Sequence, residues 1–236
     1  MTSLDANAAL LLVAAVCLVS ALVWYARQEL QPSERGDPLL DRERVFSLLC
    51  LGPAGSGKST LFCHALTLCG ETSPSHGGIP TRGIVRRLLK LPTRDGHQLC
   101  VLCDAGGGRA EQRQWVTLIR QPETVGAVVF VADLSDESET TLSLFKQVAQ
   151  AKWSRHATLI LALTHADQIN DNLQLHAIQA AREHAYKEVC SREMSVHSLD
   201  TRDEGQASAL LMEAAASISA SSKGATHSTQ RSQSLM

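Results

Sequence analysis

The sequence predicts an α/β domain with a mostly parallel central sheet, preceded by one apolar helix at the N-terminus. Three observations lead to this prediction. A long uncharged stretch opens the chain, several short apolar runs follow it, and stretches with helical spacing separate those runs. The runs do not alternate with polar residues, which is typical of strands covered by helices on both faces. With 236 residues, the chain has room for one such domain and a short segment at each end.

Residues 6–26 contain no charged side chain, and about 20 apolar residues span a bilayer as a helix. Trp24 and Tyr25 close the stretch, where aromatic rings favour the headgroup region. Lysine and arginine are absent before it, whereas Arg27 and three further arginines follow, so the positive-inside rule places the bulk of the chain in the cytosol. We expect a single transmembrane anchor over residues 1–27. A cleaved signal peptide or a buried helix is the alternative, but the basic segment of signal peptides is missing.

Residues 28–43 carry two prolines, a glycine and many charges, which is typical of a juxtamembrane linker. The predicted domain covers residues 44–218. Residues 219–236 are rich in Ser, Thr and Gln and poor in apolar side chains, so we expect a disordered tail. The formal net charge of -2 leaves no basic excess to attract nucleic-acid phosphates, so no direct nucleic-acid partner is expected.

A glycine-rich motif, G-P-A-G-S-G-K-S-T, joins the apolar run of residues 44–52 to a stretch of helical character from Leu61 onward. A strand, a glycine-rich loop and a helix in this order predict a phosphate-binding loop. The glycines let successive N–H groups point at phosphate oxygens, and the helix N-terminus adds partial positive charge. The lysine pairs with the β- and γ-phosphates, and the serine supplies a hydroxyl to Mg²⁺. The residues expected to bind phosphate are Gly52, Ala54, Gly55, Ser56, Gly57, Lys58, Ser59 and Thr60.

Three further positions are candidates for contact with the metal and the γ-phosphate. Asp104 ends the apolar run Q-L-C-V-L-C-D, and a carboxylate at a strand end beside a phosphate loop can hold Mg²⁺ through a water. Thr81, in G-G-I-P-T-R-G, can offer its hydroxyl to Mg²⁺ and its N–H to the γ-phosphate, and Gly107 permits close backbone approach. The expected metal ligands are Ser59 and Thr81. An ordinary turn or loop is the alternative for each position.

The rest of the domain continues the alternation of strands and helices. Strand-like runs cover residues 84–91, 126–133 and 157–164, and helical spacing covers residues 135–152, 173–189 and 203–218. Strands that alternate with helices of this length predict right-handed crossovers in one sheet.

The motif T-H-A-D, residues 164–167, follows the last of these runs. The Asp167 carboxylate can accept hydrogen bonds from N1–H and the 2-amino group of guanine, which adenine does not offer. We therefore expect Thr164, His165 and Asp167 at the base of bound GTP or GDP. Helix capping by Asp167 is the alternative.

Together with the predicted anchor, the motifs G-P-A-G-S-G-K-S-T, P-T-R-G, D-A-G-G-G and T-H-A-D resemble those of the Arf-like small GTPases. The β-subunit of the signal recognition particle receptor has a similar architecture. The resemblance covers residues 44–218, and the phosphate loop is its most specific motif. It implies a small-GTPase-like P-loop NTPase fold, binding of GTP and GDP with Mg²⁺, and switch segments near residues 72–84 and 104–120.

The same resemblance implies protein partners: an effector or partner subunit in membrane traffic or protein targeting, and an exchange factor or GTPase activator. It also favours a single-pass membrane protein with a cytosolic domain, with the endoplasmic reticulum as the preferred membrane.

This chain departs from the family at three points. Gly108 stands where the family has the glutamine that orients the attacking water, so we expect slow or absent GTP hydrolysis and assign no catalytic residue. His165 replaces a lysine, and only Ser195 or Ser198 loosely matches the family's segment after the last strand, which predicts weaker base recognition. The alternatives are a scaffold that holds nucleotide without cycling and a small-metabolite kinase, which would need a lid with clustered arginines.

Overall fold

The structure is a computed structural model that describes residues 45–72, 81–94, 96–120, 125–151, 157–169, 171–200 and 202–233. The predicted anchor and linker, residues 1–43, lie outside these ranges. None of the described helices has both the length and the apolar character that a membrane span requires.

The described residues form one sheet of six strands. The strands are β1 (Phe46–Leu51), β2 (Ile84–Thr93), β3 (Gly96–Ala105), β4 (Val125–Asp133), β5 (Thr158–Thr164) and β6 (Met194–Ser198). Their order is β2-β3-β1-β4-β5-β6, and β2 runs antiparallel to β3 while every other neighbouring pair is parallel. The predicted mixed α/β fold with a mostly parallel sheet is therefore confirmed.

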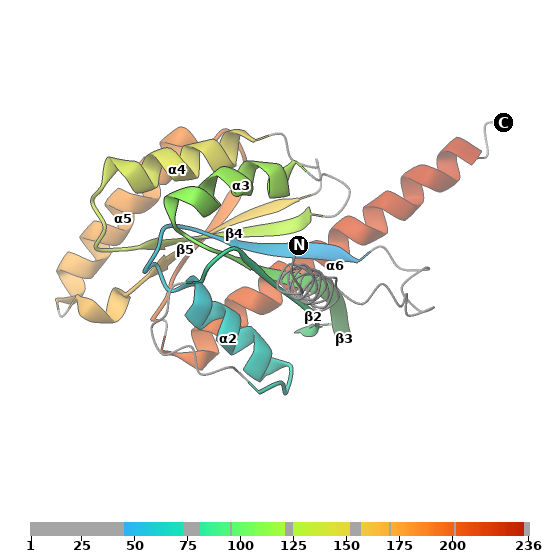
Figure 1. The fold of residues 1–236 in the computed structure, drawn as a ribbon, viewed down its shortest axis with the longest axis horizontal. Helices are drawn as coiled ribbons and strands as arrows, with labels where there is room; N and C mark the ends of the chain where they lie inside the picture. The colour runs from blue at the N-terminus through green and yellow to red at the C-terminus, as the bar shows by residue number, and fades with distance from the viewer. Residues whose placement is uncertain are drawn as a thin grey trace, which may run out of the picture. The chain divides into compact units, whose positions relative to one another are not determined.

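Helices cover both faces of this sheet (Figure 1). They are α2 (Lys58–Leu68), α3 (Arg109–Ile119), α4 (Glu139–Gln150), α5 (Asn172–Val189) and α6 (Glu204–Gln233), with a 3₁₀ turn, η1, at Ala166–Gln168. Helices α2 and α6 lie on one face, and α3, α4 and α5 lie on the other. Each strand-to-strand crossover thus places its helix where an apolar strand face needs cover.

Alternate residues of the central strands divide between two cores. On one face, Leu48 of β1 packs in a cluster with Phe62 of α2 and Leu210 of α6. On the other face, Leu49 lies in a cluster with Phe145 of α4. A fully buried side chain of this size contributes roughly 1.5–3 kcal/mol relative to an exposed one. Burial on both faces explains why the central strands appear in the sequence as unbroken apolar runs.

Two elements differ from the predictions. The tail was predicted to be disordered from residue 219, whereas α6 continues to Gln233. Residues 207–218 of α6 pack on the sheet, and once a helix is nucleated each added residue gains a backbone hydrogen bond. Met194–Ser198, which contains the two loose matches to the family's segment after the last strand, forms the edge strand β6, and no strand was predicted there. It is only half-buried along its length, so it lacks the unbroken apolar run that marks the central strands.

Candidate functional site

The loop after β1 lies where the strand order reverses, because β3 and β4 flank β1 on opposite sides. Ligands of open α/β sheets bind in the crevice beyond the carboxyl ends of the strands at such a point. Residues 52–57 of the glycine-rich motif form this loop, and α2 begins directly after it. The fold therefore directs the N-terminus of α2 into the crevice.

The backbone of the loop turns through left-handed conformations. Gly55 and Gly57 have φ angles of 83° and 84°, which side chains with a Cβ rarely adopt. Gly57 caps α2, and its carbonyl accepts from the Leu61 N–H at 3.0 Å. The N–H groups that precede Leu61 in the first turn of α2 have no intrahelical acceptor, and with the helix dipole they favour an anion. Of the other loop positions, Gly52 and Ser56 are buried, whereas Ala54 and Thr60 are exposed.

Lys58 folds back over this loop. Its Nζ donates to the Pro53 carbonyl at 2.6 Å, and the residue is only 5% exposed. Burial lowers the pKa of Lys58, and the nearby Asp104 carboxylate acts in the opposite direction by favouring the ammonium form. The cation is thus held at the loop by a single main-chain carbonyl, where phosphate oxygens can compete for its hydrogens.

Three side chains from separate elements meet beside the loop. The Ser59 hydroxyl, in α2, lies 2.8 Å from the Thr81 hydroxyl, which precedes β2. Both hydroxyls are within hydrogen-bond distance of Asp104 Oδ2 at the end of β3, at 2.9 Å from Ser59 and 2.8 Å from Thr81. We call Ser59, Thr81 and Asp104 the hydroxyl–carboxylate cluster.

The donor set of this cluster fits Mg²⁺, which favours hard oxygen ligands. Asp104 is 2% exposed, and its Oδ1 atom is buried without a hydrogen-bond partner among the described residues. A buried carboxylate oxygen without a partner is costly unless a cation or a donor satisfies it. Ser59 and Thr81 would hold the metal directly, and Asp104 would balance its charge.

Gly107 lies against the phosphate loop. A Cβ built on it would be 2.4 Å from the Ala54 nitrogen and 2.5 Å from the Pro53 carbonyl carbon, so a larger residue would push the two segments apart. Two further bonds fix this segment: the Gly106 N–H donates to Gly83 O at 2.8 Å, and Trp115 Nε1 donates to Gly106 O at 3.1 Å. The segment that follows β3 is thereby held in contact with the loop.

Gly108, the next residue, is not crowded by backbone. Its φ of -72° is open to any residue, and a Cβ there would meet only the Glu111 side chain, with Oε2 at 2.5 Å. Because Glu111 is flexible at that end, a side chain at position 108 fits if the carboxylate moves.

The T-H-A-D residues divide between two roles. Thr164 is 1% exposed, and its hydroxyl lies 3.0 Å from Ser56 O and 3.1 Å from Ala132 O. Thr164 thus joins β5 to the phosphate loop. Its expected place at the base of a bound nucleotide stays a prediction.

His165 adopts a left-handed conformation, with φ of 61°, and its Nδ1 lies 2.9 Å from Asp133 Oδ2. The other carboxylate oxygen of Asp133 accepts from the Ser135 N–H at 2.8 Å and from the Ser135 hydroxyl at 2.7 Å. Asp133 was not among the predicted site residues. Asp133 could have been found from the sequence, because it ends the apolar run that forms β4, and β4 neighbours β5 in the sheet.

Asp167 lies in η1, and Arg202 Nη2 is 3.5 Å from its Oδ2. Its Oδ1 is buried without a hydrogen-bond partner in the described part of the chain. Arg202 follows β6 and was also missed. Two serines of β6 loosely match the family's segment after the last strand. Ser195 lies inside β6, whereas Ser198 ends it, so only Ser198 adjoins the loop that follows β6 and contains Arg202.

Comparison with known proteins gives a distant similarity. No protein-family model matches the chain. The guanine nucleotide-binding protein alpha-6 subunit of Dictyostelium discoideum is 28% identical over 108 residues, 41% of this chain and 29% of that protein. The alpha-15 subunit of Caenorhabditis elegans is 26% identical over 112 residues, 42% of this chain and 30% of that protein. The mouse (Mus musculus) alpha-15 subunit is 27% identical over 115 residues, 40% and 30% of the two chains.

The chain thus matches about three tenths of the length of these curated relatives. The relatives are alpha subunits of guanine nucleotide-binding proteins, and they give no support to the finer resemblance to Arf-like proteins or to the signal recognition particle receptor. What the comparisons establish is weak homology to guanine nucleotide-binding protein alpha subunits, which agrees with the P-loop α/β fold.

Proposed function

We propose that this chain binds GTP and GDP with Mg²⁺ in the crevice at the carboxyl end of β1. The observation that supports this most strongly is the hydroxyl–carboxylate cluster, with the unpaired Oδ1 of Asp104 beside Lys58. Anion-binding N–H groups, a buried lysine and a metal site in contact are what a nucleoside polyphosphate with Mg²⁺ requires. The distant relatives are named as guanine nucleotide-binding proteins, which agrees with this ligand.

Guanine is the proposed base. The Asp167 carboxylate has one oxygen free of protein hydrogen bonds in the described residues, and two N–H groups of guanine can supply donors to it. Because Arg202 competes for the other oxygen, we expect base recognition to contribute less affinity than phosphate binding.

The test is to identify the nucleotide that the purified full chain retains, by mass spectrometry, and then to titrate fluorescent GDP with Mg²⁺ and with a chelator. We expect GDP or GTP to be retained and affinity to fall when Mg²⁺ is removed. Retention of ATP would contradict the role of Asp167, and no association with any nucleotide would contradict the proposal as a whole.

Two activities remain compatible with this site: a switch that cycles between GTP and GDP, and a scaffold that holds nucleotide without hydrolysis. Gly108 favours the scaffold, because glycine has no side chain to orient water, and mutational losses of such groups span orders of magnitude. Single-turnover hydrolysis of GTP by Gly108→Gln, compared with the unmodified chain, distinguishes them. Faster GTP hydrolysis by the variant would show that the missing glutamine side chain limits the rate in the unmodified chain. Glu111→Ala controls for displacement of the neighbouring carboxylate.

The setting of this activity is also proposed. The apolar residues 6–26 support a single-pass anchor, with the nucleotide-binding domain in the cytosol and a protein effector or partner subunit in membrane traffic or targeting, at the endoplasmic reticulum. Alkaline extraction of cell membranes tests the anchor. The full chain should stay in the membrane pellet, whereas a chain without residues 1–27 should not; release of both would contradict the anchor.

A further inference from the structure

A second cavity lies at the opposite end of β1 from the phosphate loop. It has a volume of about 340 Å³ and is bounded by Ser47, Arg86 and Cys103 and by five aliphatic side chains: Val45, Leu49, Val101, Leu118 and Val125. Cys103 directly precedes Asp104 on β3, and successive side chains of a strand point to opposite faces of the sheet. Leu49 and Cys103 belong to the core on the face of α3, whereas α2 covers the other face, so the cavity and the Asp104 carboxylate lie on opposite faces of the sheet.

Half of the lining residues are buried, and five of the eight are aliphatic. Leu49 is 2%, Val125 3% and Leu118 7% exposed, so the walls belong to the core between the sheet and α3. Among the described residues, no helix covers this part of the face of the edge strand β2, and Leu88, on the same face as Arg86, is 46% exposed. The cavity thus has an apolar interior and an open side at the edge of the sheet.

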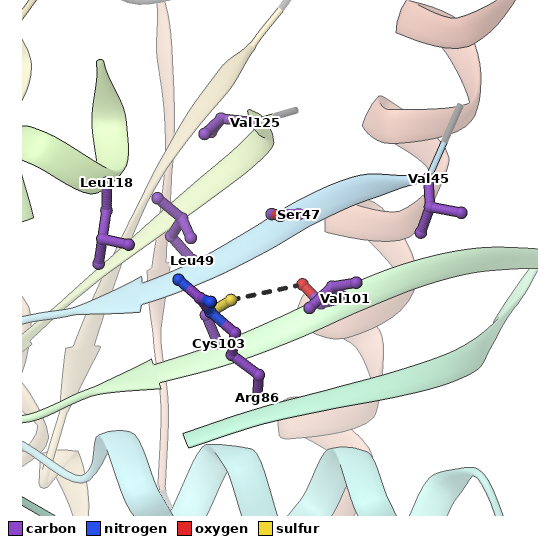
Figure 2. Close-up of a pocket in the computed structure, with 8 residues that line it drawn as sticks. All are labelled: Val45, Ser47, Leu49, Arg86, Val101, Cys103, Leu118 and Val125. Carbon is purple, nitrogen blue, oxygen red and sulfur yellow. Dashed lines mark hydrogen bonds between the residues drawn. The ribbon is translucent and has the colours of Figure 1, made fainter. Parts of the chain in front are cut away.

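One charged residue, the exposed Arg86, lines the open side of this cavity. Arg86, on β2, pairs in register with Cys103 on β3, and its side chain extends across β3 toward the Cys103 sulfur (Figure 2). Burial raises the pKa of the Cys103 thiol, and the nearby Arg86 guanidinium acts in the opposite direction. A thiol is a weak acceptor, so it satisfies only a small part of a group with five N–H donors.

Among the described residues, no acidic side chain pairs with Arg86. No carboxylate of the described residues lines the cavity. Pockets of roughly 300–1,000 Å³ with apolar walls and a few oriented polar groups are typical of small-molecule sites. A guanidinium with free donors at the edge of such a pocket selects a planar anion, and a carboxylate matches its fork geometry.

We propose that this cavity binds a monocarboxylate with an apolar body, of the size of a medium-chain fatty acid. The carboxylate pairs with Arg86 at the open side, and the chain lies against Leu49, Leu118 and Val125. Since a water-sized group occupies about 30 Å³, the volume accommodates about eleven such groups, enough for the ten heavy atoms of octanoate. The inference rests on the cavity alone and does not depend on nucleotide binding.

The test is calorimetric titration of the purified full chain with octanoate, below its micellar concentration, and with octanol as the uncharged analogue. We expect saturable binding of octanoate about twofold to fivefold tighter than octanol, because Arg86 is exposed and this ratio matches the contribution of an exposed charge pair. Arg86→Met keeps an apolar stem of similar reach and should abolish the preference for the acid. Arg87→Met is the matched control, since it removes the neighbouring arginine from the opposite face of the same strand and should leave binding unchanged.

Two further variants test whether octanoate binds in this cavity and not at the nucleotide site. Val101→Phe fills the cavity and should prevent octanoate binding, while its thermal unfolding reports whether the fold is kept. Lys58→Ala alters only the phosphate loop and should bind octanoate as the unmodified chain does. Equal octanoate affinity in Arg86→Met and the unmodified chain, or no saturable binding at all, would overturn the proposal.

Discussion

At the carboxyl end of β1 the candidate site is buried and its side chains are hydrogen-bonded to one another, whereas beyond β5 it is half-exposed and held by the His165–Asp133 hydrogen bond and the Arg202–Asp167 ion pair. Lys58 and Asp104 are 5% and 2% exposed. The side-chain oxygens of the hydroxyl–carboxylate cluster, which come from three separate segments of the chain, lie 2.8–2.9 Å from one another. Asp167, by contrast, meets Arg202, whose side chain is 81% exposed, across 3.5 Å.

The difference has a physical cause. Phosphate recognition is made mainly by backbone N–H groups and a helix N-terminus, which follow directly from the glycine-rich loop. Base recognition depends on side chains from the loops after β5 and β6, whose positions depend on partners such as Asp133 and Arg202. We therefore expect phosphate contacts to supply most of the affinity and base contacts to supply a modest selectivity.

Lys58→Ala gives the largest expected effect. It removes the ammonium group that faces the phosphates, and hydrogen bonds to charged groups contribute enough for a loss of affinity on the order of 100-fold. Titration of fluorescent GDP measures it, with Lys90→Ala, an exposed lysine on β2, as the control. If Lys58→Ala bound GDP as tightly as the control, the buried lysine would have no part in phosphate binding, and the comparison between the two ends would fail.

Asp104→Asn tests the metal at the phosphate end. The substitution keeps the shape of the side chain but removes its charge, so the Mg²⁺ concentration needed for half-maximal nucleotide binding should rise about 10- to 100-fold. Binding in the presence of a chelator should not change. Glu188→Gln, at an exposed carboxylate on α5, is the control, and an unaltered Mg²⁺ requirement in Asp104→Asn would exclude the cluster as the metal site.

Much of the fold was predictable from the sequence, because the central strands are buried on both faces. The runs that form β1, β4 and β5 are unbroken and apolar, and the helices between them show a covered face. The antiparallel direction of β2 and the strand at Met194–Ser198 were not predicted. Pairing direction leaves no mark in a single strand, and a half-buried edge strand lacks a long apolar run.

Within the candidate site, the structure brings some of the predicted residues together and gives others partners inside the chain. Ser59, Thr81 and Asp104 were each expected near the phosphates, and their side chains meet. The Thr164 hydroxyl, expected at the base, lies in the interior beside main-chain carbonyls. The partners Asp133 and Arg202 were missed, because they meet His165 and Asp167 only through neighbouring strands and loops. A sequence motif fixes the spacing of residues along the chain. The His165–Asp133 and Asp167–Arg202 pairs depend instead on how separate strands and loops lie next to each other in the fold.

Asp167→Ala sharpens the comparison at the base end. Loss of the carboxylate should reduce the preference for GDP over ADP by about tenfold, as expected for one or two charge-assisted hydrogen bonds. Affinity for ADP should stay nearly constant, because the phosphate contacts are unaffected. Competition of the two nucleotides against fluorescent GDP measures the ratio. Asp171→Ala, which removes the N-cap of α5, controls for general loosening of the following helix. An unchanged ratio would mean that Asp167 does not contact the base.

Arg202→Ala has the smallest expected effect, and whether GDP affinity rises or falls shows what Arg202 does. If Arg202 competes with guanine for the Asp167 carboxylate, its removal should raise GDP affinity about twofold to fivefold, which matches the contribution of an exposed ion pair. Added salt should reduce the difference between the variant and the unmodified chain, because exposed charges are screened. If affinity fell instead, Arg202 would be holding the carboxylate in position for the base. The base end would then be organised by its ion pair, much as the phosphate end is organised by its hydrogen bonds.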